Sequence, residues 1–456
     1  MRRPITGFSP RFVVPVLIGP VLNPINTTMI SVALVPIAAD LGVSSATVIW
    51  LVAGLYLASA IAQPTMGKLA DRFGPRRVYL IGLIVVLVAG VLPILFHSFA
   101  GVLLARILLG IGTSAAYPSA MALIRDQSVR LGEPAPQTLL SGISIASLTT
   151  AAVGPPLGGL LIALFGWPSI FLVNIPLAGA ALVMAALWLP LDSTRLVPKN
   201  TGSALASIDP VGILLFGGTI AALLVFLLDL SSGYWWLLVL GVALGGLLVW
   251  WELRRSTPFL DLRMLGSNGP LTRTYARLFL LYLASYLMTY GFSQWLQDAA
   301  GYSSGVAGLL QLPTALLAGV ASLVVARTTA LRVPLIIAAV MPLVGGVLIA
   351  SLTSDASIGL LITIAGLFGV AQGLSSVSNQ AALYRQAPVD QIGTAAGLSR
   401  TSTYLGAIAS SSIIGLVFGQ APTDGDVHVI GWVIVVAVAI AGVLAVTDAS
   451  LGRKVR

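Results

Sequence analysis

Long apolar stretches, each about 20 residues long, recur along almost the whole chain and constrain its fold more than any other feature. A helix of that length rises about 30 Å, which matches the hydrocarbon core of a bilayer. Of the 456 residues, 57% are hydrophobic and only 9% are charged, too few charges to cover a soluble surface. We therefore predict an all-α polytopic membrane protein with about 14 spans. They are expected at residues 12–37, 46–66, 78–96, 99–124, 138–165, 169–190, 210–230, 235–252, 277–298, 303–327, 332–352, 358–383, 394–419 and 428–447.

Positive charges fall in every second connection between these stretches. Residues 68–77 and 254–277 carry Lys or Arg, as do both chain ends, whereas the intervening connections carry acidic or His residues such as Asp40 and His97. Lys and Arg collect on the cytoplasmic side of membrane proteins, so we expect both termini in the cytoplasm. This asymmetry explains the net charge of +9, and no basic soluble segment favours nucleic-acid binding.

A faint internal repeat relates the two ends of the chain. Residues 110–125 in the fourth apolar stretch resemble residues 369–385 in the twelfth. Such repeats arise when a fold is built from duplicated helix bundles. The fourth and twelfth stretches are eight apart, whereas corresponding helices of two six-helix bundles would be six apart. We therefore expect two additional helices between the two bundles. The predicted domains are an N-terminal six-helix bundle at 12–190, an inserted two-helix hairpin at 210–252 and a C-terminal six-helix bundle at 277–447.

The most highly charged connection, residues 67–77, reads Gly-Lys-Leu-Ala-Asp-Arg-Phe-Gly-Pro-Arg-Arg. Its two glycines permit a tight turn, and its Asp is suited to pairing with the next Arg or to capping a helix amino terminus. The pattern resembles the signature loop of the major facilitator superfamily of secondary transporters. The resemblance implies a gate that latches one conformation, and the alternative is that the positive charges only set topology. The gating or coupling residues would be Gly67, Asp71, Arg72, Gly74 and Arg76.

Two further motifs are similar to those of the drug:proton antiporter branch with 14 transmembrane helices. The pattern Arg-x-x-x-Gly-x-Gly begins at Arg106 in the fourth stretch, and residues 154–159 read Gly-Pro-Pro-Leu-Gly-Gly in the fifth. A charge inside a span normally turns to the bundle interior or to a water-filled path, so Arg106 is expected to gate or couple transport, or else to bond backbone carbonyls as a structural hub. Gly154 and Pro155 are expected to let a helix bend between states, or else to permit a static close crossing.

Polar and aromatic side chains recur where the resemblance places a central cavity. Tyr286, Tyr290 and Gln294 follow at i, i+4 and i+8 and would share one helical face. Such a surface suits an amphipathic ligand, although each residue is equally suited to an interhelical hydrogen bond. The expected substrate-binding residues are Asn26, Tyr286, Tyr290, Gln294, Gln311, Gln372, Asn379, Arg400 and Tyr404.

The first stretch departs from the branch that the chain resembles. Three prolines ahead of Asn26 predict an interrupted first helix. The branch usually carries an acidic residue where this chain has Asn26, and no Asp or Glu lies in the middle of any apolar stretch. Because an amide does not titrate, proton coupling would require Asp71 with Arg106, a carboxylate near a helix end, or a proton carried by the substrate.

The resemblance implies a secondary active transporter that exports small amphipathic compounds, such as drugs, antibiotics or metabolites, by proton-coupled alternating access. An uncoupled facilitator and a non-transporting sensor or scaffold remain open alternatives. An enzyme is not expected, because the chain has no Cys and its two His residues lie in separate connections; an ATP-driven pump would need a P-loop motif. We expect no catalytic residue, metal or cofactor. The expected setting is a monomer in the bacterial cytoplasmic (inner) membrane, with a small-molecule substrate, lipid and protons as partners.

Overall fold

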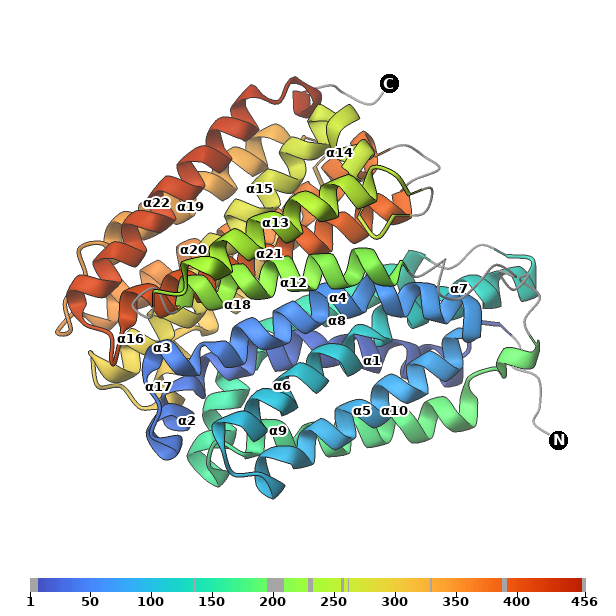
Figure 1. Ribbon diagram of the computed structural model, residues 1–456, viewed down its shortest axis with the longest axis horizontal. Helices are drawn as coiled ribbons and strands as arrows, with labels where there is room; N and C mark the ends of the chain where they lie inside the picture. Colours follow the sequence, from blue (N-terminus) through green and yellow to red (C-terminus); the bar gives the residue numbers. More distant parts are fainter. Residues whose placement is uncertain are drawn as a thin grey trace.

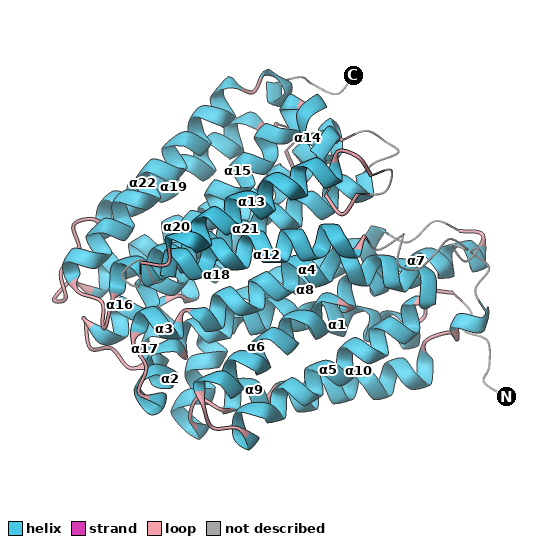
Figure 2. Ribbon diagram, in the orientation of Figure 1, coloured by secondary structure: helices cyan, strands magenta, loops and turns pink. Residues whose placement is uncertain are grey.

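The computed structural model describes residues 7–133, 137–194, 209–228, 233–255, 258–260, 262–328, 330–387 and 392–452. Helices joined by short loops make up this part of the chain, and it contains no strand (Figure 2). Eleven helices in it are long and apolar enough to cross a membrane, and Thr149–Phe165 and Pro210–Phe226 are shorter apolar helices. The predicted all-α membrane fold is therefore confirmed.

The first group of helices packs together on one side of the molecule (Figure 1). This group contains the six spans expected up to residue 190. Each apolar stretch folds as a helix because a helix satisfies the backbone polar groups of its own residues in lipid. The elements of this group are α1 (Pro10–Met29), η1 (Ile30–Val32), α2 (Leu34–Leu41), α3 (Ser45–Val48), α4 (Trp50–Phe73), α5 (Pro75–Leu95), α6 (Phe99–Ser114), α7 (Ala116–Leu131), α8 (Gln137–Phe165), α9 (Ser169–Leu172), α10 (Asn174–Trp188) and η2 (Asp192–Thr194).

A second group packs on the other side, and the hairpin α12 (Pro210–Leu228) and α13 (Trp235–Glu252) precedes it in the chain. α12 contacts α4 of the first group and α21 of the second. The exact domain limits remain a prediction. The elements of the second group are α14 (Leu262–Ser267), α15 (Gly269–Tyr286), η4 (Leu287–Phe292), α16 (Ser293–Asp298), α17 (Ser304–Leu310), α18 (Leu312–Ala326), α19 (Arg332–Ile349), α20 (Ile358–Gln386), α21 (Ile392–Phe418), α22 (Asp424–Thr447) and η6 (Ala449–Gly452).

The two groups are fastened together at the end of the molecule away from both chain termini. This closed end carries α2, α3, α16 and α17, whereas the N- and C-termini lie at the opposite, terminal end (Figure 1). The backbone N–H of Ser45 donates to the carbonyl of Gln420 (3.1 Å), and that of Ala46 donates to Gly419 (3.0 Å). The Ser45 hydroxyl also donates to Asp298 at 3.2 Å. These bonds hold the first group against the second.

The first helix differs from the prediction. α1 runs without interruption through Pro15, Pro20 and Pro24, and the helix changes to a short 3-10 segment only at Ile30–Val32. Neighbouring polar groups bond to carbonyls around the prolines: Tyr79 donates to Pro15, and Thr27 donates to Pro24 at 2.8 Å. Prolines are tolerated in membrane helices when surrounding groups satisfy the disturbed backbone in this way.

Candidate functional site

The signature connection forms a tighter turn than the sequence indicates. α4 continues through Gly67 and Arg72 to Phe73, and α5 begins at Pro75, so only Gly74 interrupts the helices. Gly74 has φ +104°, and an added Cβ would lie 2.2 Å from Cγ of Asp192. Glycine is therefore required at this turn.

Asp192, which the sequence analysis did not single out, stabilises this turn. Its carboxylate accepts hydrogen bonds from the backbone N–H of Arg76 (3.1 Å) and Arg77 (2.9 Å), the first exposed donors of α5. The Arg76 guanidinium donates to the carbonyl of Ala186 at 2.8 Å. A helix cap is thus supplied by Asp192 of η2, which follows α10, and it lies at the N-terminus of α5, where the helix dipole favours an anion. The side chain of Asp71 lies outside the described part of the structure.

Arg106 is a buried hub between three helices. Its side chain is 1% exposed, and it donates to the carbonyl of Leu51 (2.9 Å) and to that of Asn26 (2.8 Å). These contacts tie α6 to α4 and α1, as the structural alternative anticipated. The gating role assigned to Arg106 remains a prediction.

Asn26 forms a reciprocal amide pair with Asn174, a residue that the sequence analysis missed. The Asn26 amide donates to Asn174 at 2.6 Å, and Asn174 donates back at 2.8 Å. Both side chains are buried, and the pair joins α1 to α10. Asn26 therefore faces a neighbouring helix in this conformation, and substrate contact by Asn26 is a prediction for another state.

Five tyrosines from four helical elements, α4, α15, η4 and α21, form a cluster between the two groups. We call Tyr56, Tyr282, Tyr286, Tyr290 and Tyr404 the tyrosine cluster. The ring centroid of Tyr56 lies 5.1 Å from that of Tyr286 and 5.8 Å from that of Tyr404. The rings of Tyr286 and Tyr290 are stacked at 5.6 Å, with 7° between their planes. The predicted proximity of Tyr286 and Tyr290 is thus present.

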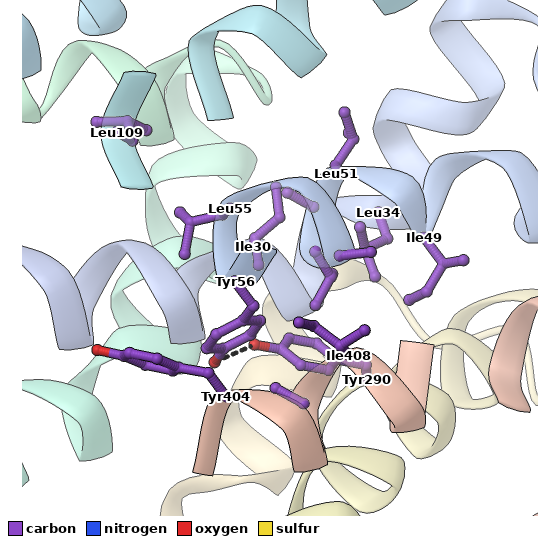
Figure 3. Packing of buried hydrophobic residues seen from close by; sticks show 14 of the residues in the cluster. Ile30, Leu34, Ile49, Leu51, Leu55, Tyr56, Leu109, Tyr290, Tyr404 and Ile408 are labelled. Carbon is purple, nitrogen blue, oxygen red and sulfur yellow. Dashed lines mark hydrogen bonds between the residues drawn. The ribbon is translucent and has the colours of Figure 1, made fainter. Parts of the chain in front are cut away.

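Hydrogen bonds within the cluster join the two groups (Figure 3). The hydroxyl of Tyr290 donates to the carbonyl of Thr27 (2.7 Å) and lies 3.0 Å from the hydroxyl of Tyr56. Tyr56 consequently donates to Tyr290. The Tyr404 hydroxyl donates to Gln63, again from the second group to the first. Each of these bonds must break or rearrange if the groups separate here.

A π-helical segment shapes the cluster. The structure places Tyr286 at the end of α15, Tyr290 within the π-helix η4 and Gln294 in α16. The wider π-turn alters the strict α-helical spacing that the sequence analysis assumed, and such bulges are frequent at functional sites. Gln294 is fully buried, and neither atom of its amide bonds to a described residue. A buried amide without a hydrogen-bond partner lowers the stability of the fold, so the Gln294 amide is available to bond to a ligand or to water.

The remaining predicted residues separate into different environments. Gln311 is 5% exposed between α17 and α18, and its amide nitrogen makes no hydrogen bond in the described chain. Gln372 lines a small pocket between α15, α19 and α20. Asn379 accepts a hydrogen bond from Arg277 at 2.8 Å and donates to Ser375 at 2.9 Å, which places it in a buried network at the terminal end.

Arg400 is exposed although aromatic side chains from both groups surround it. Its guanidinium carbon lies 5.5 Å from the ring centroid of Tyr117 on α7. It lies one helical turn before Tyr404 on α21, so the two side chains share a face of that helix. The sequence missed Tyr117, Tyr56 and Gln63, because local spacing does not indicate which helices meet.

The glycine and proline motif of α8 lies at the contact between the two groups. A Cβ on Gly154 would lie 1.8 Å from the Thr28 hydroxyl oxygen of α1. On the other side, a Cβ on Gly308 of α17 would lie 2.6 Å from the carbonyl oxygen of Pro155. The absence of side chains allows α8 to touch both neighbours.

A charged cluster joins the inserted hairpin to α4. Asp209 and Glu252 are buried, and Asp209 accepts hydrogen bonds from Trp251 (2.9 Å) and from the backbone of Gly212 (3.2 Å). Both carboxylates interact electrostatically with Lys68. The ammonium group of Lys68 makes no hydrogen bond to a described residue.

No group of three His, Asp or Glu side chains suited to a metal ion occurs in the described ranges. His97 lies 2.9 Å from Asp40, and the Nε2 atom of His428 lies 2.5 Å from the Leu352 carbonyl oxygen, both at the closed end.

Membrane-spanning helices in two groups, with a polar and aromatic site between them, define the class of secondary transporters. The profile of the Major Facilitator Superfamily matches residues 16–411, and the chain belongs to this family of transporters.

The chain is 34% identical over 451 residues to the uncharacterized MFS-type transporter YwoD of Bacillus subtilis, covering 96% of this chain and 97% of that protein. It is 29% identical over 404 residues to the multidrug efflux pump LfrA of Mycolicibacterium smegmatis, covering 86% of this chain and 78% of LfrA. The crystal structure of a POT family transporter in complex with 5-aminolevulinic acid has a TM-score of 0.72 at 16% identity, covering 97% of this chain and 98% of that one. This last similarity shows the fold alone.

Proposed function

We propose that the protein exports small amphipathic compounds across the bacterial cytoplasmic membrane by alternating access, as a monomer with both termini in the cytoplasm. The observation that carries this proposal is the tyrosine cluster, which is built by both groups and lies between them. Aromatic rings give an amphipathic molecule a large contact area, and their hydroxyl groups bind its polar part. The similarity to a multidrug efflux pump supports the direction of transport.

The closed end supports one state of the cycle. The bonds of Ser45 and Ala46 to the second group would seal the outer face, if the alternation of positive charges sets the topology. In this state the site would be reached from the cytoplasm. Export would then require the closed end to part and the terminal end to close around the tyrosine cluster.

We also propose that protons drive this export, through a carboxylate at the terminal end. The described buried carboxylates Asp126, Asp209, Glu252 and Asp448 lie near that end. Glu252 is the preferred candidate, because it is buried and interacts electrostatically with Lys68 of α4, so its environment would change with the contacts of α4. The second candidate function is an uncoupled facilitator, favoured by the neutral pair of Asn26 and Asn174 where an acidic residue was expected.

Transport in proteoliposomes tests the proposed function. Purified protein would be reconstituted and offered a panel of labelled amphipathic compounds, with and without an imposed pH gradient. We expect saturable transport of at least one compound that accelerates with the gradient and is lost in Arg106→Ala. A transport rate that is the same with and without the pH gradient would favour the facilitator. A transport rate no higher than that of protein-free vesicles would contradict export.

A further inference from the structure

Arg400 is a charged residue within an apolar helix, next to aromatic residues of both groups. It is exposed, yet it interacts electrostatically with Tyr117 of the first group and with Tyr282, Tyr286 and Tyr404 of the second. An arginine within a membrane-spanning helix normally lies in the bundle interior or along a water-filled path. Its exposed side chain therefore lies next to aromatic residues of both groups, where a ligand could reach it.

The two arginines near the cluster differ in their hydrogen bonds. Arg106 is almost completely buried, and backbone carbonyls of Leu51 and Asn26 occupy two of its donors. Arg400 instead presents its charge to the ring of Tyr117. No carboxylate among the described side chains lies within ion-pair distance of Arg400. Its planar fork of N–H donors remains able to bind a ligand.

The positive charge of Arg400 favours anionic ligands over cationic ones. A guanidinium pairs with a carboxylate through two parallel, charge-assisted hydrogen bonds. A cation at the same place would be repelled by Arg400 with no described acidic side chain to compensate. The ring of Tyr282, which is only partly buried, is suited to contact with an aromatic ring held next to the carboxylate.

We propose that Arg400 and the adjoining tyrosines form a binding site for aromatic carboxylates, with Arg400 pairing the carboxylate and the tyrosines contacting the ring. This proposal rests on the proposed function, since it names the substrate class of the exporter. Tyr117 comes from the first group and Arg400 from the second. When the two groups move apart or together at the terminal end, the contacts of Tyr117 and Arg400 with the ligand therefore change. Gln63 of the first group accepts a hydrogen bond from the hydroxyl of Tyr404 and so holds the Tyr404 ring in place.

The test compares three ligands with one ring system and different charges. The probes are 2-naphthoate, the neutral 2-naphthamide and the cationic 2-naphthylmethyl-trimethylammonium, titrated calorimetrically into full-length protein in lipid nanodiscs. We expect naphthoate to bind at least tenfold more tightly than the other two. Arg400→Gln should remove this preference, and Arg400→Lys should retain part of it because the charge remains while the fork is lost. Arg273→Gln, at an exposed position on α15, is the matched control and should change nothing.

Equal affinity for the three probes, no binding of naphthoate, or unchanged naphthoate binding in Arg400→Gln would each overturn the site. Uptake of the same probes into proteoliposomes separates this result from the proposed function. Arg400-dependent naphthoate binding without transport of any compound would support the site and contradict export. Transport of neutral or cationic amphiphiles with no binding of naphthoate would overturn the site and support export.

Discussion

Replacing Gly308 with Ala tests whether the closed end separates during transport. A Cβ at this position lies 2.6 Å from the carbonyl oxygen of Pro155 and 3.2 Å from its carbonyl carbon. Both atoms belong to the backbone and do not yield by a rotamer change. α17 must therefore move away from α8 by about 1 Å to restore ordinary contact distances.

The size of the effect follows from this overlap. Overpacking at a tight contact costs about 1–3 kcal/mol. The cost applies only to the conformation in which α8 and α17 touch, because a state with the closed end parted has room for the methyl group. The equilibrium between the two states should then shift by about 5- to 150-fold toward the parted state.

Cysteine labelling measures this shift, since the native chain has no Cys. Ser31 is fully buried at the closed end, and its carbonyl accepts a hydrogen bond from Ser293 of the second group at 2.9 Å. Labelling of Ser31→Cys by an impermeant maleimide from outside the cell should accelerate by the same factor when Gly308→Ala is added. Gly319→Ala is the control, because a Cβ there has nothing within 4 Å. Equal labelling rates in the two variants, at equal abundance in the membrane, would refute the reasoning.

Three further predictions concern topology and stability. Ser354→Cys should react with impermeant maleimide in intact cells and Glu133→Cys only after permeabilisation, and the reverse pattern would overturn the proposed orientation. Asp192→Ala should remove the cap of α5 and lower stability by about 1 kcal/mol, measured as thermal unfolding in detergent; an unchanged melting temperature would remove its structural role. Lys68→Met should lower stability by about 1 kcal/mol by removing the positive charge near two buried carboxylates, and adding Glu252→Gln should recover part of the loss; strict additivity would argue against an interaction of Lys68 with Glu252.

The fold was predictable because its strongest determinant is local. An apolar stretch of about 20 residues must fold as a helix to satisfy its backbone in lipid, wherever it lies in the bundle. Helix ends were less predictable, because a helix leaving the membrane continues into water for as long as its residues permit. α4 therefore extends to Phe73, beyond the expected end at residue 66, and the charges of Lys68 and Arg72 lie on a helix.

The candidate site was predictable only where one helix supplies neighbouring residues. Tyr286 and Tyr290 were found from their spacing, and their rings are stacked. The partners that complete the site come from distant parts of the sequence, as with Asn26 and Asn174, which are 148 residues apart. Tyr56 and Tyr117 belong to the first group, and nothing in their local sequence indicates that the second group faces them. Pairing between helices is a property of the assembled fold.

Reversible cross-linking of the closed end tests alternating access most directly. Ser45 and Gln420 belong to different groups, and the hydrogen bond of 3.1 Å between their backbones brings the two positions close enough for a disulfide. With Ser45→Cys and Gln420→Cys in the Cys-free chain, we expect oxidation to abolish transport in proteoliposomes and reduction to restore it. Undiminished transport by fully cross-linked protein would contradict the claim that the two groups must separate at this end.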